Sequence, residues 1–241
     1  DGVSAALAAE AGLLGDPDAL AGPLAAGTGV DLDIARFASP VARITRVDSK
    51  PFCTARQAQA AVEAATIAHA ELGGAPVAEI EVAVPAAYRA MVDQPEPASR
   101  LTSLMSAQRQ IAVALTGGAA LYDVARDDLR LPPEAERIMR ATRVVTDDAL
   151  TELYPDVLPA RVRMRAVGGG EAQCLVRDPL GARERPLGWA ALSEKHTRIG
   201  AWSQRLEQAM RLSRELGAGA AVAPARELLN LTQDLPQEAV T

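Results

Sequence analysis

One stretch decides how this chain is read: Ser49-Lys50-Pro51-Phe52-Cys53-Thr54-Ala55-Arg56-Gln57-Ala58-Gln59. It runs into an alanine-rich helix, predicted over Thr54 to Leu72 because apolar residues recur there at spacings of three and four. The first turn of such a helix has unpaired backbone N–H groups and the positive end of the helix dipole, and both favour an anion. Lys50 and Arg56 add a point charge and a planar guanidinium fork. The stretch therefore predicts a site for an anionic ligand.

Working outward from this helix, the chain combines strand patterns with helix patterns. Residues 77–84 alternate apolar and polar side chains, as in a strand with one buried face. Further strands are predicted at 41–46, 144–145, 160–167 and 171–177, the last two joined as a hairpin across three glycines. Helices are predicted at 3–14, 85–92, 103–116, 132–141, 189–199, 202–216 and 224–231. This order predicts an α+β fold, with an α+β domain over 40–187 inserted between the helical segments 1–39 and 188–241.

Composition narrows the class of protein. The chain has 241 residues, of which 49% are hydrophobic and only 3% aromatic, so its core must be built from Ala, Leu, Val and Ile. The net charge of -6 argues against nucleic acid as a partner, because phosphate binding needs a basic face. No apolar run approaches the roughly 18 residues of a membrane span, and no secretory signal is visible. A cytoplasmic protein without a membrane partner is expected.

Few residues suit metal or thiol chemistry. The two cysteines, Cys53 and Cys174, are predicted to be free thiols. Two histidines without C-x-x-C, H-E-x-x-H or calcium-loop spacing predict no metal site. Arginines 161, 163 and 165 alternate along one strand. Because aromatic residues are not interleaved with them, we expect a solvated face paired with acids rather than a nucleic-acid surface.

Several short motifs, taken in order, resemble a known family. They are Gly2-Val3 with Ala5-Ala6-Leu7, Lys50-Pro51-Phe52 with Arg56 and Ala60-Ala61-Val62-Glu63-Ala64, Ile80-Glu81-Val82, Ser106 with Ala112-Val113-Ala114-Leu115, and Asp178-Pro179-Leu180-Gly181 with Pro186-Leu187. This order resembles the later part of the MmgE/PrpD family, which includes 2-methylcitrate dehydratase, cis-aconitate decarboxylase and iminodisuccinate epimerase. The resemblance covers nearly the whole chain, and the order of the motifs is a stronger signal than any one of them.

The resemblance implies an all-helical domain, only partly present here, with a smaller inserted α+β lid domain. It places an active site between the two domains of a homodimer that uses neither a metal nor an organic cofactor. The helical half that precedes this part in the family is missing from the chain. We therefore expect either a fragment of a longer enzyme or a complementary chain that supplies the N-terminal helical half.

The chain departs from the family pattern at three positions. Cys53 replaces a second proline, Gln59 replaces a histidine, and Arg109 replaces a tyrosine. A glutamine side chain is neither a general acid nor a general base. An arginine is a permanent cation that binds carboxylates well but transfers protons poorly. These departures keep carboxylate binding and predict altered chemistry.

The family's reactions remove or add a proton next to a carboxylate, and cations stabilise the enolate-like charge that develops. Lys50 and Arg109 are the candidate catalytic residues. The alternatives are a solvated loop lysine and an arginine at a domain interface.

The candidate substrate-binding residues are Thr54, Arg56 and Gln59. Each has a structural alternative: Thr54 as a helix cap, Arg56 in a salt bridge to Asp48 or Glu63, and Gln59 bonded to local backbone.

Three functions remain open. The first is a cofactor-independent lyase that dehydrates or decarboxylates a small polycarboxylate or related carboxylic acid. The second is an isomerase, epimerase or cyclase-type enzyme that uses the same proton abstraction. The third is a non-catalytic subunit of a heteromeric enzyme. The sequence does not name the substrate.

Overall fold

The computed structural model describes residues 2–16, 18, 20–29, 47–123, 130–200 and 204–217. The chain divides into two compact units, Asp1–Val47 and Asp48–Thr241. The first unit contains helix α1 (Gly2–Glu10), a π-helical turn η1 (Leu20–Leu24) and the short helix α2 (Ala25–Thr28). The helix predicted over 3–14 is confirmed, although it ends at Glu10. The strand predicted at 41–46 and the helix predicted at 224–231 lie outside the described residues.

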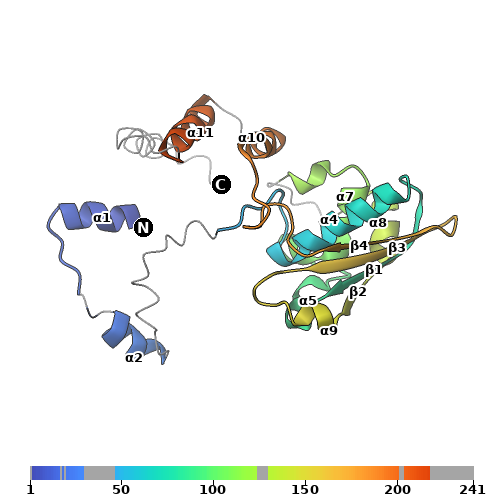
Figure 1. Ribbon diagram of the computed structural model, residues 1–241, viewed down its shortest axis with the longest axis horizontal. Coiled ribbons are helices and arrows are strands. Elements are labelled where there is room, and N and C mark those ends of the chain that lie inside the picture. The colour runs from blue at the N-terminus through green and yellow to red at the C-terminus, as the bar shows by residue number, and fades with distance from the viewer. Residues whose placement is uncertain are drawn as a thin grey trace. The chain divides into compact units, whose positions relative to one another are not determined.

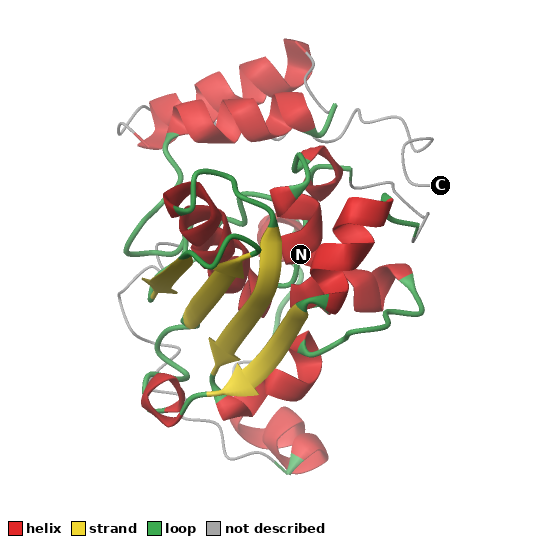
Figure 2. Cartoon of the chain, turned by 90° about the vertical axis from the view of Figure 1, so that its right-hand side faces the viewer, coloured by secondary structure: helices red, strands yellow, loops and turns green. Residues whose placement is uncertain are grey.

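The second unit is built on a four-stranded sheet with the strand order β2-β1-β3-β4 (Figure 2). The strands are β1 (Val77–Val84), β2 (Thr142–Thr146), β3 (Ala160–Ala166) and β4 (Glu171–Val176). β1 pairs parallel with β2 and antiparallel with β3. β3 and β4 form the hairpin that the sequence predicts. Its turn needs glycine, because Gly169 has a φ of 87°, which residues with a side chain rarely adopt.

Helices α4 (Arg56–Glu71), α7 (Ala107–Leu115) and α8 (Pro133–Arg140) lie along one face of this sheet (Figure 1). α4 packs on β3 and β4, and α7 packs between α4 and α8. The core side of α4 consists of six fully buried alanines: Ala58, Ala60, Ala61, Ala64, Ala65 and Ala68. Such small side chains let the helix approach Val162 and Met164 of the sheet closely, so a core with few aromatic residues still packs densely.

The helix predicted over 103–116 is two helices. α6 (Arg100–Met105) ends at Ser106, whose backbone is extended, and α7 begins immediately after it. The Ser106 hydroxyl accepts a hydrogen bond from the Arg109 N–H at 3.1 Å and donates one to the Gln94 carbonyl at 2.6 Å. A serine that caps the following helix interrupts the helical pattern here.

Several further elements complete the described part of this unit. They are α5 (Ala86–Val92), the 3₁₀ turn η3 (Ala119–Leu121), α9 (Asp148–Thr151), α10 (Trp189–Arg198) and α11 (Gln204–Gly217). The mixture of helix and sheet agrees with the predicted α+β class. The division into domains at 1–39, 40–187 and 188–241 stays a prediction. Within the described part of the chain, no helix is long and apolar enough to cross a membrane.

Candidate functional site

The loop from Asp48 to Ala55 leads into α4 and is held by elements distant in sequence. The Cys53 N–H donates to the Leu121 carbonyl at 2.9 Å, and the Ala55 N–H donates to the Leu104 carbonyl at 2.9 Å. The Ser49 N–H donates to the Gly181 carbonyl at 2.8 Å. The residues of the sequence motif are therefore presented on a fixed segment.

Thr54 bonds to a segment distant in sequence and does not cap α4. The residue is 2% exposed, and its hydroxyl donates to the Leu104 carbonyl at 2.9 Å. The cap position of α4 belongs to Ala55, which makes no side-chain cap bond. The expectation that Thr54 caps this helix is therefore wrong, because the tertiary partner takes the hydroxyl. The backbone carbonyl of Thr54 has a second use, since it accepts a hydrogen bond from Lys50.

Lys50 lies exposed at the start of the loop. Its Nζ donates to the Thr54 carbonyl at 3.0 Å, so the side chain folds back over the loop toward α4. Among the described residues, no carboxylate forms an ion pair with it. An ammonium group has three donors, and this bond uses one of them. The other two can meet an incoming anion.

Arg56 is half-exposed in the first turn of α4, where it forms an ion pair with Asp48. The sequence predicted a salt bridge to Asp48 or Glu63 as the structural alternative for Arg56, and the structure has the one to Asp48. The Asp48 carboxylate offsets the unfavourable placement of a cation at the positive end of the helix dipole. Arg56 therefore stabilises the loop that carries Lys50.

A cavity of about 340 Å³ opens beside α4 and the loop. Most of its lining is apolar, with side chains from Pro51, Phe52, Val62, Ile67, Ala114, Leu121, Pro179 and Leu180. The polar lining residues are Gln59, Glu63, Thr66, Tyr122 and Arg198. On α4 the lining positions are spaced by three and four residues, so one face of the helix forms this wall. The volume falls in the range of small-molecule sites, roughly 300–1,000 Å³.

Gln59 is the polar group of this wall that lacks a partner. Its side chain is 4% exposed, and its Nε2 has no hydrogen-bond acceptor. A buried donor left unsatisfied costs roughly 1–3 kcal/mol. An unpaired buried donor beside a cavity makes Gln59 the candidate polar residue of this wall.

Another part of the lining comes from Pro179 and Leu180, in the segment 178–187 that Glu63 holds against α4. The Glu63 carboxylate accepts the Leu180 N–H at 2.7 Å and pairs with the Arg185 guanidinium at 2.8 Å. Both of its oxygens are thus occupied. Glu63 positions the wall and is not available to a ligand.

Tyr122 and Arg198 line another part of the cavity. The Arg198 guanidinium carbon lies 4.9 Å from the centre of the Tyr122 ring, which is the geometry of a cation–π contact. Arg198 also pairs with Glu194 one turn earlier on α10. This contact joins α10 to the end of η3.

Arg109 is buried within α7 at 5% exposure and is not among the residues that line the cavity. Of the five candidate residues, only Gln59 lines the cavity; Lys50, Thr54 and Arg56 lie in the loop and first turn before it, and Arg109 lies on the neighbouring helix. α7 contributes Ala114 to the cavity wall.

Sequence reasoning missed most of the cavity lining. Glu63 and Thr66 follow Gln59 at spacings of four and seven, so the helical period of an alanine-rich helix marks them as the same face. Phe52 stands within the Lys50-Pro51-Phe52 motif. Tyr122 and Leu180 carry no local signal, because the fold brings them in from distant segments.

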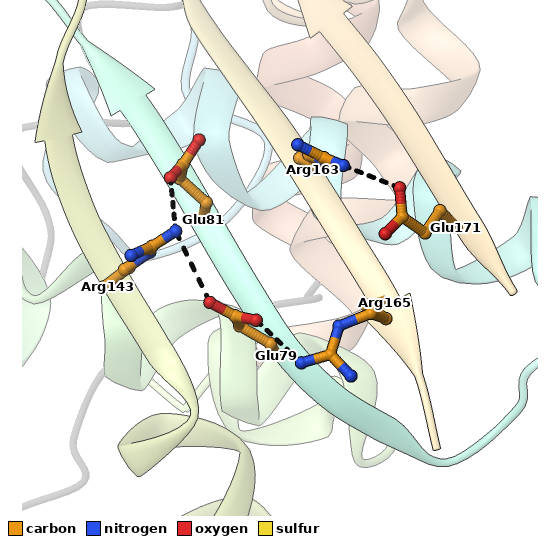
Figure 3. A pocket seen from close by; sticks show the side chains of 6 residues that line it. All are labelled: Glu79, Glu81, Arg143, Arg163, Arg165 and Glu171. Atoms are coloured by element: carbon orange, nitrogen blue, oxygen red, sulfur yellow. Dashed lines mark hydrogen bonds and ion pairs between the residues drawn. The ribbon is translucent and has the colours of Figure 1, made fainter. Parts of the chain in front are cut away.

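A second hollow, of about 150 Å³, lies on the open face of the sheet (Figure 3). Arg165 pairs with Glu79 at 2.9 Å, Arg163 with Glu171 at 2.8 Å, and Arg143 with Glu81 at 2.8 Å. The hydrogen bond from Arg165, helped by the charge of Arg143, holds the pKa of Glu79 below its usual value. This confirms the prediction of an arginine strand paired with acids. Because the charges satisfy one another, this hollow is a weaker candidate than the cavity at Gln59.

Cys53 and Cys174 are both free and half-buried, as predicted. Burial raises the pKa of the Cys174 thiol, with a smaller contribution from nearby glutamates, so its reactive thiolate is disfavoured. Within the described residues, no group of three or more His, Cys, Asp or Glu side chains is placed to hold a metal ion.

Comparison with known proteins identifies the fold family. Residues 52–215 match the model of the MmgE/PrpD C-terminal domain, and this span includes the cavity lining from Phe52 to Arg198. A comparison with curated proteins found no match. The family match covers more than half of the chain and agrees with the order of motifs around Lys50. Together these findings show that this chain belongs to the MmgE/PrpD family, through its C-terminal domain.

Proposed function

We propose that this chain is part of a lyase that dehydrates or decarboxylates a small polycarboxylate or related carboxylic acid. Members of the MmgE/PrpD family are generally enzymes, and that supports a catalytic role. The proposed dehydration begins with removal of a proton from the carbon next to a carboxylate, whereas the proposed decarboxylation adds a proton at the carbon that loses its carboxylate. The proposed step needs only acid–base groups and cations.

The observation that carries the proposal is the position of Lys50. The chain has two lysines among its 25 Lys and Arg residues, and one of them stands at the mouth of α4 without a carboxylate partner among the described residues. A neutral amine can accept a proton, and an ammonium can stabilise negative charge, whereas a guanidinium can only do the second. A lysine at this place therefore suits both removal of the α-proton and stabilisation of the negative charge that develops on the substrate.

The other candidate residues receive distinct roles in this proposal. Gln59 donates a hydrogen bond to a substrate oxygen. Thr54 holds Lys50 through its carbonyl, and Arg56 holds the loop through Asp48. Arg109 is the second candidate cation, from α7. The proposed partner is either a second copy of the chain in a homo-oligomer or a complementary chain that carries the N-terminal helical half.

The proposed dehydration starts at the carbon beside the carboxylate. The C–H bond beside the carboxylate breaks, and the proton moves to the Lys50 amine. The electron pair passes through an enolate-like species into a new C=C bond, and the hydroxyl on the next carbon leaves as water after taking up the proton from the Lys50 ammonium, which restores the amine. In decarboxylation the C–C bond to a carboxylate breaks instead, carbon dioxide leaves, and the electron pair stays on the carbon as an enolate-like species that takes up a proton from the Lys50 ammonium.

Proton NMR in D₂O tests the proposal with the full chain, alone and together with a chain carrying the family's N-terminal helical half. The substrates are hydroxylated di- and tricarboxylates. We expect loss of the α-proton signal and formation of an alkene. Lys50→Ala and Lys50→Arg should each slow the loss of the α-proton signal, called proton exchange below, by about 10²- to 10⁴-fold. The reason is that neither variant retains a base at this position.

Lys195→Arg is the matched control, since it changes the other lysine. Full exchange in Lys50→Arg would rule out proton transfer by Lys50 and leave it only an electrostatic role. Deuterium incorporation with the substrate otherwise intact would instead favour an isomerase or epimerase. Absence of exchange in both preparations would favour the non-catalytic subunit.

A further inference from the structure

The face of the sheet opposite α4, α7 and α8 carries charged side chains that are arranged by strand (Figure 3). β2 contributes Arg143, β1 contributes Glu79 and Glu81, and β3 contributes Arg163 and Arg165. Because β1 lies between β2 and β3, rows of positive, negative and positive charge alternate across the sheet. With Glu171 of β4, three arginines and three glutamates line this hollow, so it presents both signs equally.

These side chains are paired but remain accessible. The side chain of Arg163 is 59% exposed and that of Glu81 is 34% exposed. Within the described residues, the ion pairs of Arg143, Arg163 and Arg165 with glutamates are all made by Nη2. A guanidinium has five N–H donors, and a carboxylate has about four acceptor positions. Both kinds of group therefore keep bonding capacity for a partner outside the sheet.

A partner with one sign of charge does not fit this face. Nucleic acid or a basic peptide would meet a row of like charge beside every row of opposite charge. A partner that matches must alternate in sign at the spacing of neighbouring strands. A second copy of the same sheet has that pattern.

The register of the strands selects one arrangement of two copies. Glu81 pairs across the ladder with Arg163, and Glu79 pairs with Arg165. A two-fold axis parallel to the strands, midway between β1 and β3, sets each of these glutamates opposite the corresponding arginine of the second copy. A two-fold axis perpendicular to the strands would instead set β1 on β1 and glutamate on glutamate.

The outer strands agree with the first of these axes. Gln173 of β4 faces Arg143 of the second copy, because both lie level with the Glu81–Arg163 pair. By the same register, Leu175, which is 55% exposed, faces Val145 of the second copy. Both contacts avoid like charges, and the second adds apolar burial at the edge of the interface.

We propose that this chain self-associates through the open sheet face, as a two-fold dimer in which the β1 glutamates of each copy pair with the β3 arginines of the other. This inference goes beyond the proposed function, because the face lies on the other side of the sheet from α4, which forms one wall of the cavity. Loss of the proposed lyase function would leave the interface standing.

Sedimentation equilibrium of the full chain tests the interface. We expect a dimer whose dissociation constant rises at least about tenfold between about 20 mM and about 500 mM NaCl, because salt screens the pairs. Glu79→Lys with Glu81→Lys, and separately Arg163→Glu with Arg165→Glu, should each weaken the dimer by at least about tenfold. An equimolar mixture of the two variants should associate again, because each β1 row then faces a β3 row of opposite charge.

Glu134→Lys with Glu136→Lys is the matched control. It makes the same change of charge and breaks two exposed ion pairs on α8, so it should leave association unchanged. Single variants at the exposed Gln173 break no ion pair, and there Gln173→Glu should tighten the dimer while Gln173→Lys should weaken it. A full chain that is monomeric at low salt, a mixture that stays dissociated, or a dimer indifferent to both changes at Gln173 would overturn the inference.

Discussion

Gly181 adopts a φ of 90° and lies so close to Ser49 that a β-carbon on it would stand 1.8 Å from the Ser49 carbonyl oxygen. This residue joins the wall segment 178–187 to the loop that carries Lys50. The contact is possible only because glycine has no side chain. At the scale of the single residue, the close contact between the segment 178–187 and the Lys50 loop therefore depends on glycine at position 181 as well as on the hydrogen bond between Ser49 and Gly181.

Gly181→Ala should therefore destabilise the chain by roughly 2 kcal/mol or more, since it adds a steric clash to the strain of a positive φ. Gly74→Ala is the matched control, because Gly74 has a φ of 73° but nothing lies within 4 Å of its β-carbon position. That variant should lose only about 1 kcal/mol. Urea unfolding measures both free energies, and equal losses would show that the contact with Ser49 is unimportant.

At the scale of the element, one side of α4 packs in the core and the other side lines the cavity. Its fully buried alanines pack on β3, β4 and α7, while Gln59, Glu63 and Thr66 face the cavity. Close packing of small side chains leaves little room for adjustment on the core side. The position of Gln59 is therefore set by the alanine packing behind it.

Ala65→Leu tests this packing. We expect it to destabilise the fold by roughly 1–3 kcal/mol, because the added atoms have no space in the core. Ala70→Leu, at an exposed position in the last turn of the same helix, should change stability by less than about 0.5 kcal/mol. Thermal and urea unfolding of both variants provide the comparison. A tolerated Ala65→Leu would mean that α4 has room to shift.

At the scale of the whole molecule, the pH dependence of stability reports on burial. Tyr88 of α5 is buried, its hydroxyl donates to the Pro159 carbonyl at 2.8 Å, and its ring lies edge-on to Tyr154. Burial raises the pKa of Tyr88 well above its usual value, with a smaller contribution from Tyr154. The folded state thus holds this proton more tightly than the unfolded state does.

The sign of the effect follows from this raised pKa. The contribution of Tyr88 to stability is complete below the unfolded pKa of about 10 and is lost as the pH rises above it. Tyr88→Phe should lose about 1 kcal/mol at neutral pH, with the hydrogen bond, but decline less steeply above about pH 10. Urea unfolding at a series of pH values measures both. If the free energy of unfolding falls equally steeply above about pH 10 in both proteins, the loss of stability at alkaline pH comes from other groups.

Much of the fold could be predicted because its signals are local. The alternation over Val77–Val84 and the three-and-four spacing of α4 depend on residues close in sequence, and both elements were confirmed. The glycines after β3 marked the hairpin for the same reason. The break at Ser106 was missed, because the bond from its hydroxyl to Gln94 depends on how the preceding loop returns.

In the candidate site too, some features depend on local sequence and others depend on the tertiary structure. The sequence by itself determined the family, the helix α4 and the stretch from Lys50 to Gln59 at its start, since each rests on order and spacing along the chain. Only the tertiary structure decided which of those groups are occupied. Leu104 takes the Thr54 hydroxyl across 50 residues, and Leu180 meets Glu63 across 117. The physical reason is that a hydrogen-bond partner is chosen by distance in space, so only the packed chain leaves Lys50 exposed and the Gln59 amide nitrogen buried without a partner.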